Sequence, residues 1–238
     1  MTSLRAPGWL LWLGMFLAIA GTTVFAWQTG TLRLPDRWNP WAPLDLETAQ
    51  GPLLRWKLGR LTDDAEACRA FLTRTSLHAR YLEDRVTGQG CGFTNAVMVS
   101  GVDGVTAEPF SVSCRTAASL AFWERHVLQP AAERHFGSPV ERLEHFGSYA
   151  CRGIYGRESA RRSQHATADA LDVAGFVLAN GTRITVARDW EGTTQARAFL
   201  QELHEGACRY FDAVLGPEYN AAHHDHFHLD RGRARVCR

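Results

Sequence analysis

The sequence has almost no net charge, since 26 lysines and arginines and 25 aspartates and glutamates leave +1 over 238 residues. Arginines dominate the cations and are scattered rather than gathered in a stripe, so nothing in the charge pattern points to DNA or RNA. No internal repeat, low-complexity tract or C-x-x-C pair is visible, and the last absence argues against a tetrathiolate zinc site. A hydrophobic content of 45% is typical of an ordinary globular protein.

A long uncharged run lies near the N-terminus. Residues 8–27 carry no charge, and a helix of that length, at about 1.5 Å per residue, crosses a hydrocarbon core of roughly 30 Å. Trp9, Trp12 and Trp27 would then lie at the two membrane interfaces. The segment Val24-Phe25-Ala26 also suits signal-peptide cleavage. Residues 1–27 are therefore predicted to be a membrane anchor or a cleaved signal, and in both cases the body is exported.

Six well-separated cysteines support export. An even number in an exported domain predicts three disulfides with open connectivity, and the alternative is six free thiols in a cytosolic protein. A bridge between Cys208 and Cys237 would tie the terminal segment to the preceding helix.

Residues 28–51 are rich in proline and tryptophan and predict a linker, whose tryptophans fold back on the domain or lie at the membrane surface. The domain itself is expected over 52–238.

Helix and strand patterns alternate along the domain without a βαβ rhythm. Helices are predicted over 63–72, from a cap at Ser111 or Ser113 to about Leu128, and over 194–215. Strands are predicted over 96–100, 140–146, 171–178, 182–186 and 225–230, with Asn180-Gly181 as a hairpin turn. This order predicts an α+β fold with a small antiparallel sheet flanked by helices, preceded by a transmembrane helix.

Histidines concentrate near the C-terminus, where four of the ten fall within residues 223–228. On a strand, the histidines at positions 224, 226 and 228 would share one face, while Phe227 and Leu229 would face the core. Upstream, His165 and Asp172 lie seven positions apart. The remaining histidines are predicted to be surface or core residues: His78, His126, His135, His145 and His204.

A catalytic zinc needs three protein ligands and an open position, which His165, Asp172 and His228 would provide. Zinc lowers the pKa of a bound water toward roughly 7, and a nearby group must then accept the proton. His226 is two residues from His228 and is predicted to be that base. Weaker candidates, for the base or for fixing imidazole tautomers, are Asp225, His223 and His224. The alternative is a solvated histidine-rich loop with incidental metal affinity.

The pattern Ser163-x-His165-x-x-Ala168-x-Ala170-x-Asp172, followed by His226-x-His228, resembles the LAS group of zinc peptidases. That group includes D-Ala-D-Ala carboxypeptidases, murein endopeptidases and the hedgehog signalling domain. The resemblance implies a hedgehog/DD-peptidase-like fold, Zn²⁺ on His165, Asp172 and His228, and His226 as general base. It also matches His223 to a histidine that murein endopeptidases carry five residues before the last ligand.

Within this group, residues from about Pro52 to Arg238 resemble the bacterial extensin-like C-terminal domain family. The segments that carry this resemblance are Gly90-Cys91-Gly92, Ser148-Tyr149-Ala150-Cys151-Arg152 and Asp225-His226-Phe227-His228-Leu229-Asp230.

The sequence departs from the LAS pattern in two ways. Ala168 replaces the usual glycine, a change expected to be tolerated if φ is negative there. No Glu-x-x-His is present, so the base must be a histidine.

Many LAS enzymes stabilise the oxyanion with an arginine before the first motif. Arg152 is the best positional match, Arg161 and Arg162 are rivals, and a structural ion pair is the alternative role. Ser163 is expected to orient the loop or His165 rather than to act as a nucleophile.

Three hypotheses follow for the function. The first is a zinc hydrolase anchored in the inner membrane, facing the periplasm, that cleaves peptide cross-links of peptidoglycan; cleavage of the signal would make it a secreted enzyme. The second is a non-catalytic, zinc-stabilised binding domain of the cell envelope. The third is a disulfide-held envelope protein without metal.

Overall fold

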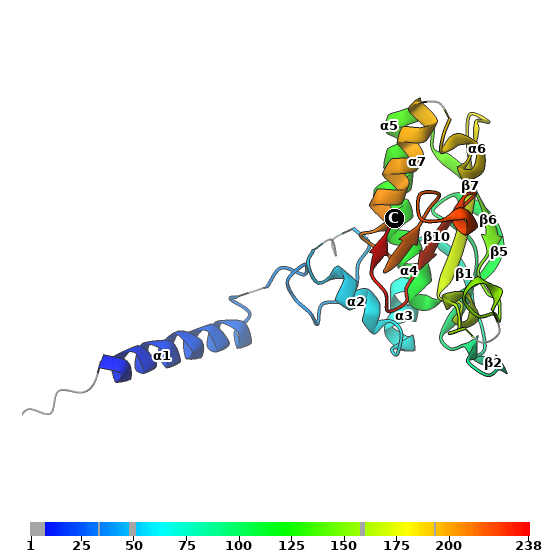
Figure 1. Ribbon diagram of the computed structural model, residues 1–238. Helices are drawn as coiled ribbons and strands as arrows, with labels where there is room; N and C mark the ends of the chain where they lie inside the picture. Colours follow the sequence, from blue (N-terminus) through cyan, green and yellow to red (C-terminus); the bar gives the residue numbers. More distant parts are fainter. Residues whose placement is uncertain (1–7, 33, 48–50, 158–159, 193) are drawn as a thin grey trace, which may run out of the picture.

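An apolar helix precedes the folded part of the chain. The computed structural model describes residues 8–32, 34–47, 51–157, 160–192 and 194–238. Helix α1 (Gly8–Gln28) buries no residue and stands apart from the domain (Figure 1). Within these described ranges, it is the one helix long and apolar enough to cross a membrane, a property that signal sequences share. The predicted anchor or signal segment is therefore helical, although residues 1–7 lie outside the described residues.

A nine-stranded mixed sheet forms the centre of the domain. Its strands, in spatial order, are β1 (Leu77–Tyr81), β4 (Ala96–Val102), β5 (Val105–Ser113), β6 (Val140–Gly147), β7 (Ala170–Leu178), β10 (Phe227–Asp230), β9 (Ala213–Leu215) and β11 (Val236–Cys237), with β8 (Arg183–Thr185) paired to β7. A separate hairpin consists of β2 (Arg85–Gly88) and β3 (Cys91–Phe93).

Strand directions correct the predicted sheet. The α+β class is confirmed, but the pairs β5–β6 and β9–β11 are parallel, so the sheet is mixed and larger than expected. The chain crosses from β5 to β6 through helices, and such a crossover is what allows two successive strands to run in the same direction.

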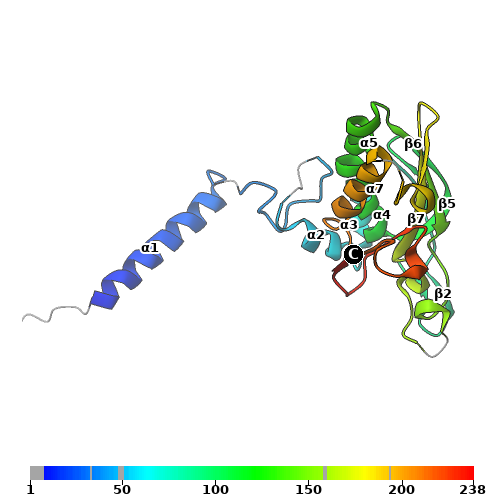
Figure 2. The same cartoon turned by 45° about the horizontal axis from the view of Figure 1, so that its top comes forward.

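Helices cover one face of the sheet, as Figure 2 shows. They are α2 (Leu54–Arg60), α3 (Ala65–Leu72), α4 (Cys114–Trp123), α5 (Gln129–Phe136) and α7 (Thr194–Ala207), and the short α6 (Val186–Asp189) follows β8. Side chains alternate along a strand, so Leu171 and Val173 of β7 are fully buried in the core while Asp172 points to the opposite face. Phe227 and Leu229 are likewise fully buried, as predicted.

The helix that begins after Ser113 continues past its predicted end. A π-helical turn (Glu124–Leu128) joins α4 to α5, and Pro130 lies in the first turn of α5. Proline directly follows a π-helical turn, where the regular ladder of backbone hydrogen bonds is already interrupted. Ser113 stands at the cap position, but its hydroxyl donates to Asp169 Oδ1 at 2.6 Å.

The helix predicted over 194–215 is wrong in its second half. α7 ends at Ala207, and residues 213–215 form β9, which lies between β10 and β11 in the sheet. Pairing with two distant strands therefore overrides the local helical pattern. The strands expected at 96–100 and 140–146 and the hairpin of β7 with β8 are confirmed. So is the helix expected at 63–72, which begins after Asp64, whose side chain accepts from the Ala67 amide at 2.8 Å.

All six cysteines form disulfides, as predicted. The pairs are Cys68–Cys114 between α3 and α4, Cys91–Cys151 between β3 and the loop after β6, and Cys208–Cys237 between the end of α7 and β11. Closing loops of 46, 60 and 29 residues stabilises a fold by about 4 kcal/mol each in the chain-entropy account. Three disulfides together with α1 are typical of a domain that folds outside the cytoplasm.

Part of the predicted linker packs on the domain. Leu44 is buried in the core, and the Leu46 carbonyl lies 2.7 Å from His126 Nε2. Lys57 Nζ donates to the Asp36 carbonyl at 2.9 Å. Residues 33 and 48–50 of the linker lie outside the described residues. The remainder is held against the domain at several points.

Candidate metal centre

The three predicted zinc ligands converge on the sheet face that the helices leave open. His165, Asp172 and His228 are all buried, and each offers a ligand atom within 4.8 Å of the other two. His165 Nε2 lies 3.1 Å from Asp172 Oδ2 and 3.1 Å from His228 Nδ1. His228 Nδ1 is 2.9 Å from Asp172 Oδ1. Among the described residues, this is the one such group of histidine, cysteine or acidic side chains.

The turn that carries His165 is a short 3-10 helix, η3 (Gln164–Thr167), just before β7. Ser163 caps it, because its hydroxyl accepts from the His165 amide at 3.4 Å. Ala168 ends it in the left-handed conformation, with φ of 56°. The condition that φ be negative at this position is therefore not met, and a residue with a Cβ atom costs roughly 1–2 kcal/mol there.

The outer nitrogens of the two ligand histidines are both hydrogen-bonded. His165 Nδ1 bonds to the Ser148 carbonyl, and His228 Nε2 lies 3.1 Å from Asp230 Oδ2. Both oxygens only accept, so these nitrogens carry the protons. In neutral imidazoles, His165 Nε2 and His228 Nδ1 then keep their lone pairs and face Asp172. This arrangement of histidines held by oxygen acceptors is the one that metal-binding histidines adopt, and the donor set fits zinc.

The electrostatics of the group favour a positive charge at its centre. Burial raises the pKa of Asp172, but the hydrogen bonds to His165 and His228 lower it further, to well below its usual range. Burial lowers the pKa of His228, yet its bonds to Asp172 and Asp230 raise it overall to about 9. A proton on His228 thus balances the buried carboxylates in the protein alone.

His226 lies beside the three ligands with one nitrogen turned toward them. Its Nδ1 is 2.8 Å from Asp225 Oδ1, and its Nε2 is 3.6 Å from Asp172 Oδ1. Because the Asp225 carboxylate accepts the Nδ1 proton, Nε2 is left as the free base of the neutral ring. Phe146 packs edge-on against the ring, with centroids 5.7 Å apart.

His223, one of the predicted supporting residues, lies beside His226, whereas His224 does not share the ligand face as the predicted alternation required. Residues Ala221–His223 form a 3-10 turn, and β10 begins only at Phe227, so a period of two does not hold before it. The His224 side chain is 70% exposed. The His223 ring lies 5.3 Å from that of His226, and burial, followed by the nearby imidazoles, lowers its pKa to about 4.

A cleft of about 530 Å³ opens over the ligands. Arg152, Arg161 and Arg162 all line it. Arg152 is half-exposed, and its guanidinium lies 3.8 Å from Asp172 Oδ2. Arg162 Nε instead donates to the Gln89 carbonyl at 3.0 Å. Arg152 thus forms an ion pair with one of the candidate ligands, in a position that allows both of its predicted roles.

Two residues that orient the histidines were not predicted from the sequence. Asp230 follows His228 by two positions on β10, and the strand period of two could have revealed it. The Ser148 carbonyl is a backbone group, for which the sequence carries no signal.

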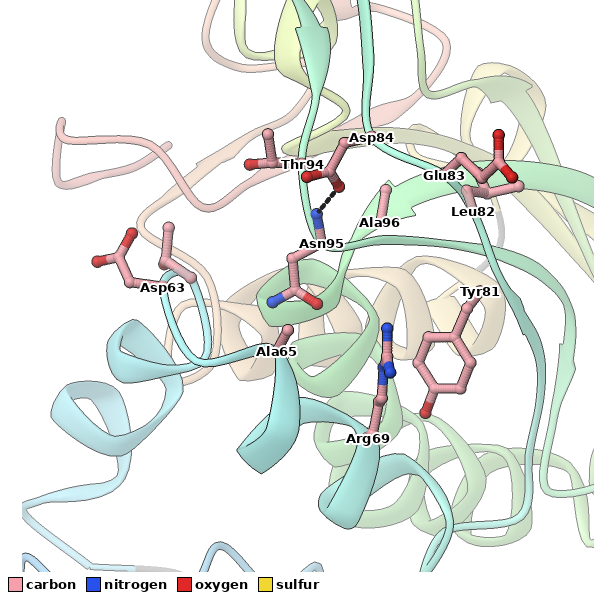
Figure 3. A pocket seen from close by; sticks show the side chains of 11 residues that line it. Asp63, Ala65, Arg69, Tyr81, Leu82, Glu83, Asp84, Thr94, Asn95 and Ala96 are labelled. Atoms are coloured by element: carbon pink, nitrogen blue, oxygen red, sulfur yellow. Dashed lines mark hydrogen bonds between the residues drawn. The ribbon is translucent and has the colours of Figure 1, made fainter.

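A second hollow of the domain lies elsewhere. It has a volume of about 730 Å³ and runs between α3 and β1, where the Arg69 guanidinium stacks 5.2 Å above the centre of the Tyr81 ring (Figure 3). No histidine or cysteine lines it, and its acidic residues form no metal-ligating group in the described part of the chain. The candidate metal ligands therefore lie in the cleft over His165, Asp172 and His228.

A comparison with protein families finds one that spans the sheet and this cleft. A family model described as Extensin-like protein C-terminus matches residues 66–238. The chain belongs to this family. The matched part of the extensin-like chain contains all three ligand residues and all six cysteines. No curated protein and no solved structure matches the chain.

Proposed function

We propose that this extensin-like protein is a zinc-dependent hydrolase of the cell envelope that cleaves peptide cross-links of peptidoglycan. The observation that carries the proposal is the convergence of His165, Asp172 and His228, with both outer imidazole nitrogens held by oxygen acceptors. The motif resemblance to LAS peptidases supports the peptide substrate. Helix α1 and the disulfides support action outside the cytoplasm, with anchoring in the inner membrane.

Each residue near the ligands has a role in this proposal. Zinc would polarise a peptide carbonyl and lower the pKa of a bound water toward roughly 7. His226 would accept a proton at Nε2 and return it to the leaving amine, while Asp225 holds the ring and stabilises its charged form. Arg152 would stabilise negative charge that develops on the carbonyl oxygen. His223, neutral at pH 7 because of its low pKa, adds no charge beside His226.

The first experiment measures zinc in the purified full chain. We expect about one zinc per chain, and loss of that zinc in His165→Ala and in Asp172→Ala. His224→Ala is the matched control, because this histidine belongs to the same cluster but points into solvent. Stoichiometric zinc in both ligand variants would contradict the assignment.

The second experiment incubates the same proteins with purified murein sacculi. The wild type should release peptides, and His226→Ala should retain zinc but lose release by about 100-fold or more. Wild-type protein that holds zinc and releases nothing would instead favour a non-catalytic, zinc-stabilised binding domain of the cell envelope.

A further inference from the structure

Three exposed tryptophans lie on the segment after α1 and on α2, the first helix of the domain. Trp38, Trp41 and Trp56 are 53%, 70% and 48% exposed. The Trp41 ring contacts that of Trp27 in the last turn of α1, with centroids 6.0 Å apart. Scattered apolar side chains are normal on a protein surface, whereas several large ones that continue an exposed apolar helix mark an interaction site.

These tryptophans belong to a surface that is fixed to the domain. The Asp36 carbonyl accepts from Lys57 Nζ, which ties the Trp38 turn to α2. Leu44, a few residues after Trp41, is buried in the core. Arg55 of α2 donates to the Cys208 carbonyl at 2.9 Å. The segment that carries Trp38 and Trp41 is therefore packed together with α2.

The chemistry of this surface suits a lipid headgroup layer. Trp56 and Arg60 lie four residues apart on α2, with the guanidinium 5.2 Å from the indole centre, and both are exposed. Arg37 is exposed next to Trp38. Indole rings prefer the membrane interface, where one edge is apolar and the other is wet, and arginines add attraction to anionic headgroups.

We propose that Trp38, Trp41 and Trp56, here called the tryptophan face, rest in the headgroup layer of the membrane that α1 spans. The domain then lies directly on the bilayer rather than on a free tether. In Figure 2, the helices α2, α3 and α7 lie nearer to α1 than the orange-red segment around residues 221–226 does. The cleft, which residues of this segment line, therefore lies in the part of the domain that is farther from α1.

Photocrosslinking of the full chain in nanodiscs of phosphatidylethanolamine and phosphatidylglycerol tests this inference. Variants Trp41→p-benzoylphenylalanine and Trp56→p-benzoylphenylalanine keep an aromatic side chain at the tested positions. After illumination, mass spectrometry counts lipid adducts. We expect at least a five-fold excess of adducts at both positions over Val86→p-benzoylphenylalanine, the control on the β2–β3 hairpin, where Val86 is highly exposed.

Phe16→p-benzoylphenylalanine, in the middle of α1, reports whether the helix is in the bilayer. Adducts at position 16 with only control levels at 41 and 56 would overturn the tryptophan face while leaving the anchor intact. Control levels at all positions, including 16, would overturn both. Neither result depends on zinc or on peptide release, so failure here is distinct from failure of the proposed hydrolase.

Discussion

His228 lies directly opposite Asp172 in the antiparallel pair of β10 and β7. Paired residues on one sheet face hold their Cβ atoms about 4.5–5.5 Å apart, which suits two ligands of one cation. The spacing between these ligands is thus set by backbone hydrogen bonds of the sheet, and only the third ligand, His165, depends on a turn. Such a site is largely preorganised before any metal binds.

Asp230 is expected to tune metal affinity through His228. Asp230→Ala removes the acceptor for His228 Nε2, so the imidazole loses its fixed tautomer and orientation, and zinc affinity should fall by about 10–100-fold. Asp230→Asn should recover part of the loss, because its amide oxygen still accepts. Chelator competition on the full chain measures both. Unchanged affinity in Asp230→Ala would show that the bond has no such role.

Rates of peptide release distinguish the role of Arg152 from the roles of the neighbouring arginines. Arg152→Met should slow release by about 10²–10³-fold, as loss of an oxyanion donor does, while zinc content stays the same. Arg161→Met is the control, since Arg161 lines the same cleft. A lower melting temperature with an unchanged release rate would instead identify Arg152 as a structural ion-pair partner of Asp172.

The left-handed conformation of Ala168 predicts that replacing it with glycine destabilises the fold less than the same change at Ala170. Ala168 and Ala170 are both fully buried, but only Ala168 has a positive φ. Both glycine variants lose a methyl group and gain unfolded-state entropy, so the difference between them isolates the strain. Ala168→Gly should be more stable than Ala170→Gly by about 1–2 kcal/mol. Denaturant unfolding measures the difference, and equal stabilities would argue against the strained turn.

Glu124 is expected to make stability depend on pH. It is buried in the π-helical turn, and burial raises its pKa from 4.5 to about 7, although the nearby Gln129 side chain acts to lower it. Between those pH values the folded chain holds a proton that the unfolded chain releases. Stability contributed by this group is therefore present below about pH 4.5 and is lost as the pH rises through 7, by about 3 kcal/mol in total.

The variant Glu124→Gln removes that titration. The wild type loses stability as the pH rises and the variant does not. The difference in unfolding free energy should therefore shift in favour of Glu124→Gln by about 3 kcal/mol between pH 4.5 and pH 8. Glu133→Gln, on the exposed side of α5, serves as the control and should show no such change. A constant difference for Glu124→Gln across this range would mean that the carboxylate finds a partner when it ionises.

The sequence predicts those parts of the fold that depend on local patterns. Alternation places Phe227 and Leu229 in the core, and the acidic residues at 63–64 mark the start of α3. The parallel pairing of β5 with β6 and the conversion of 213–215 into β9 depend on contacts between distant segments. Local sequence patterns do not contain information on those contacts, so the sequence predicts a smaller and purely antiparallel sheet.

The candidate site shows the same division. The motif predicts His165, Asp172 and His228 as ligands of one ion, because that prediction depends only on residue types and their spacing along the chain. His223 is predicted as a supporting residue, but the alternation that places His224 on the ligand face is wrong. That alternation depends on where β10 begins. The start of β10 follows a 3-10 turn that Asn220 caps, its side chain accepting from the Ala222 amide at 3.0 Å.

The division of the cleft between strands and loops has an evolutionary consequence. Two ligands are fixed within the central sheet, whereas Arg152, Tyr155, Tyr219 and Arg233 at the mouth come from connecting segments. Insertions and substitutions in those segments would change which molecule enters the cleft without moving Asp172 and His228 in the sheet. Under the proposed function, relatives with the same two sheet residues would keep the reaction chemistry and differ in the molecules that they accept.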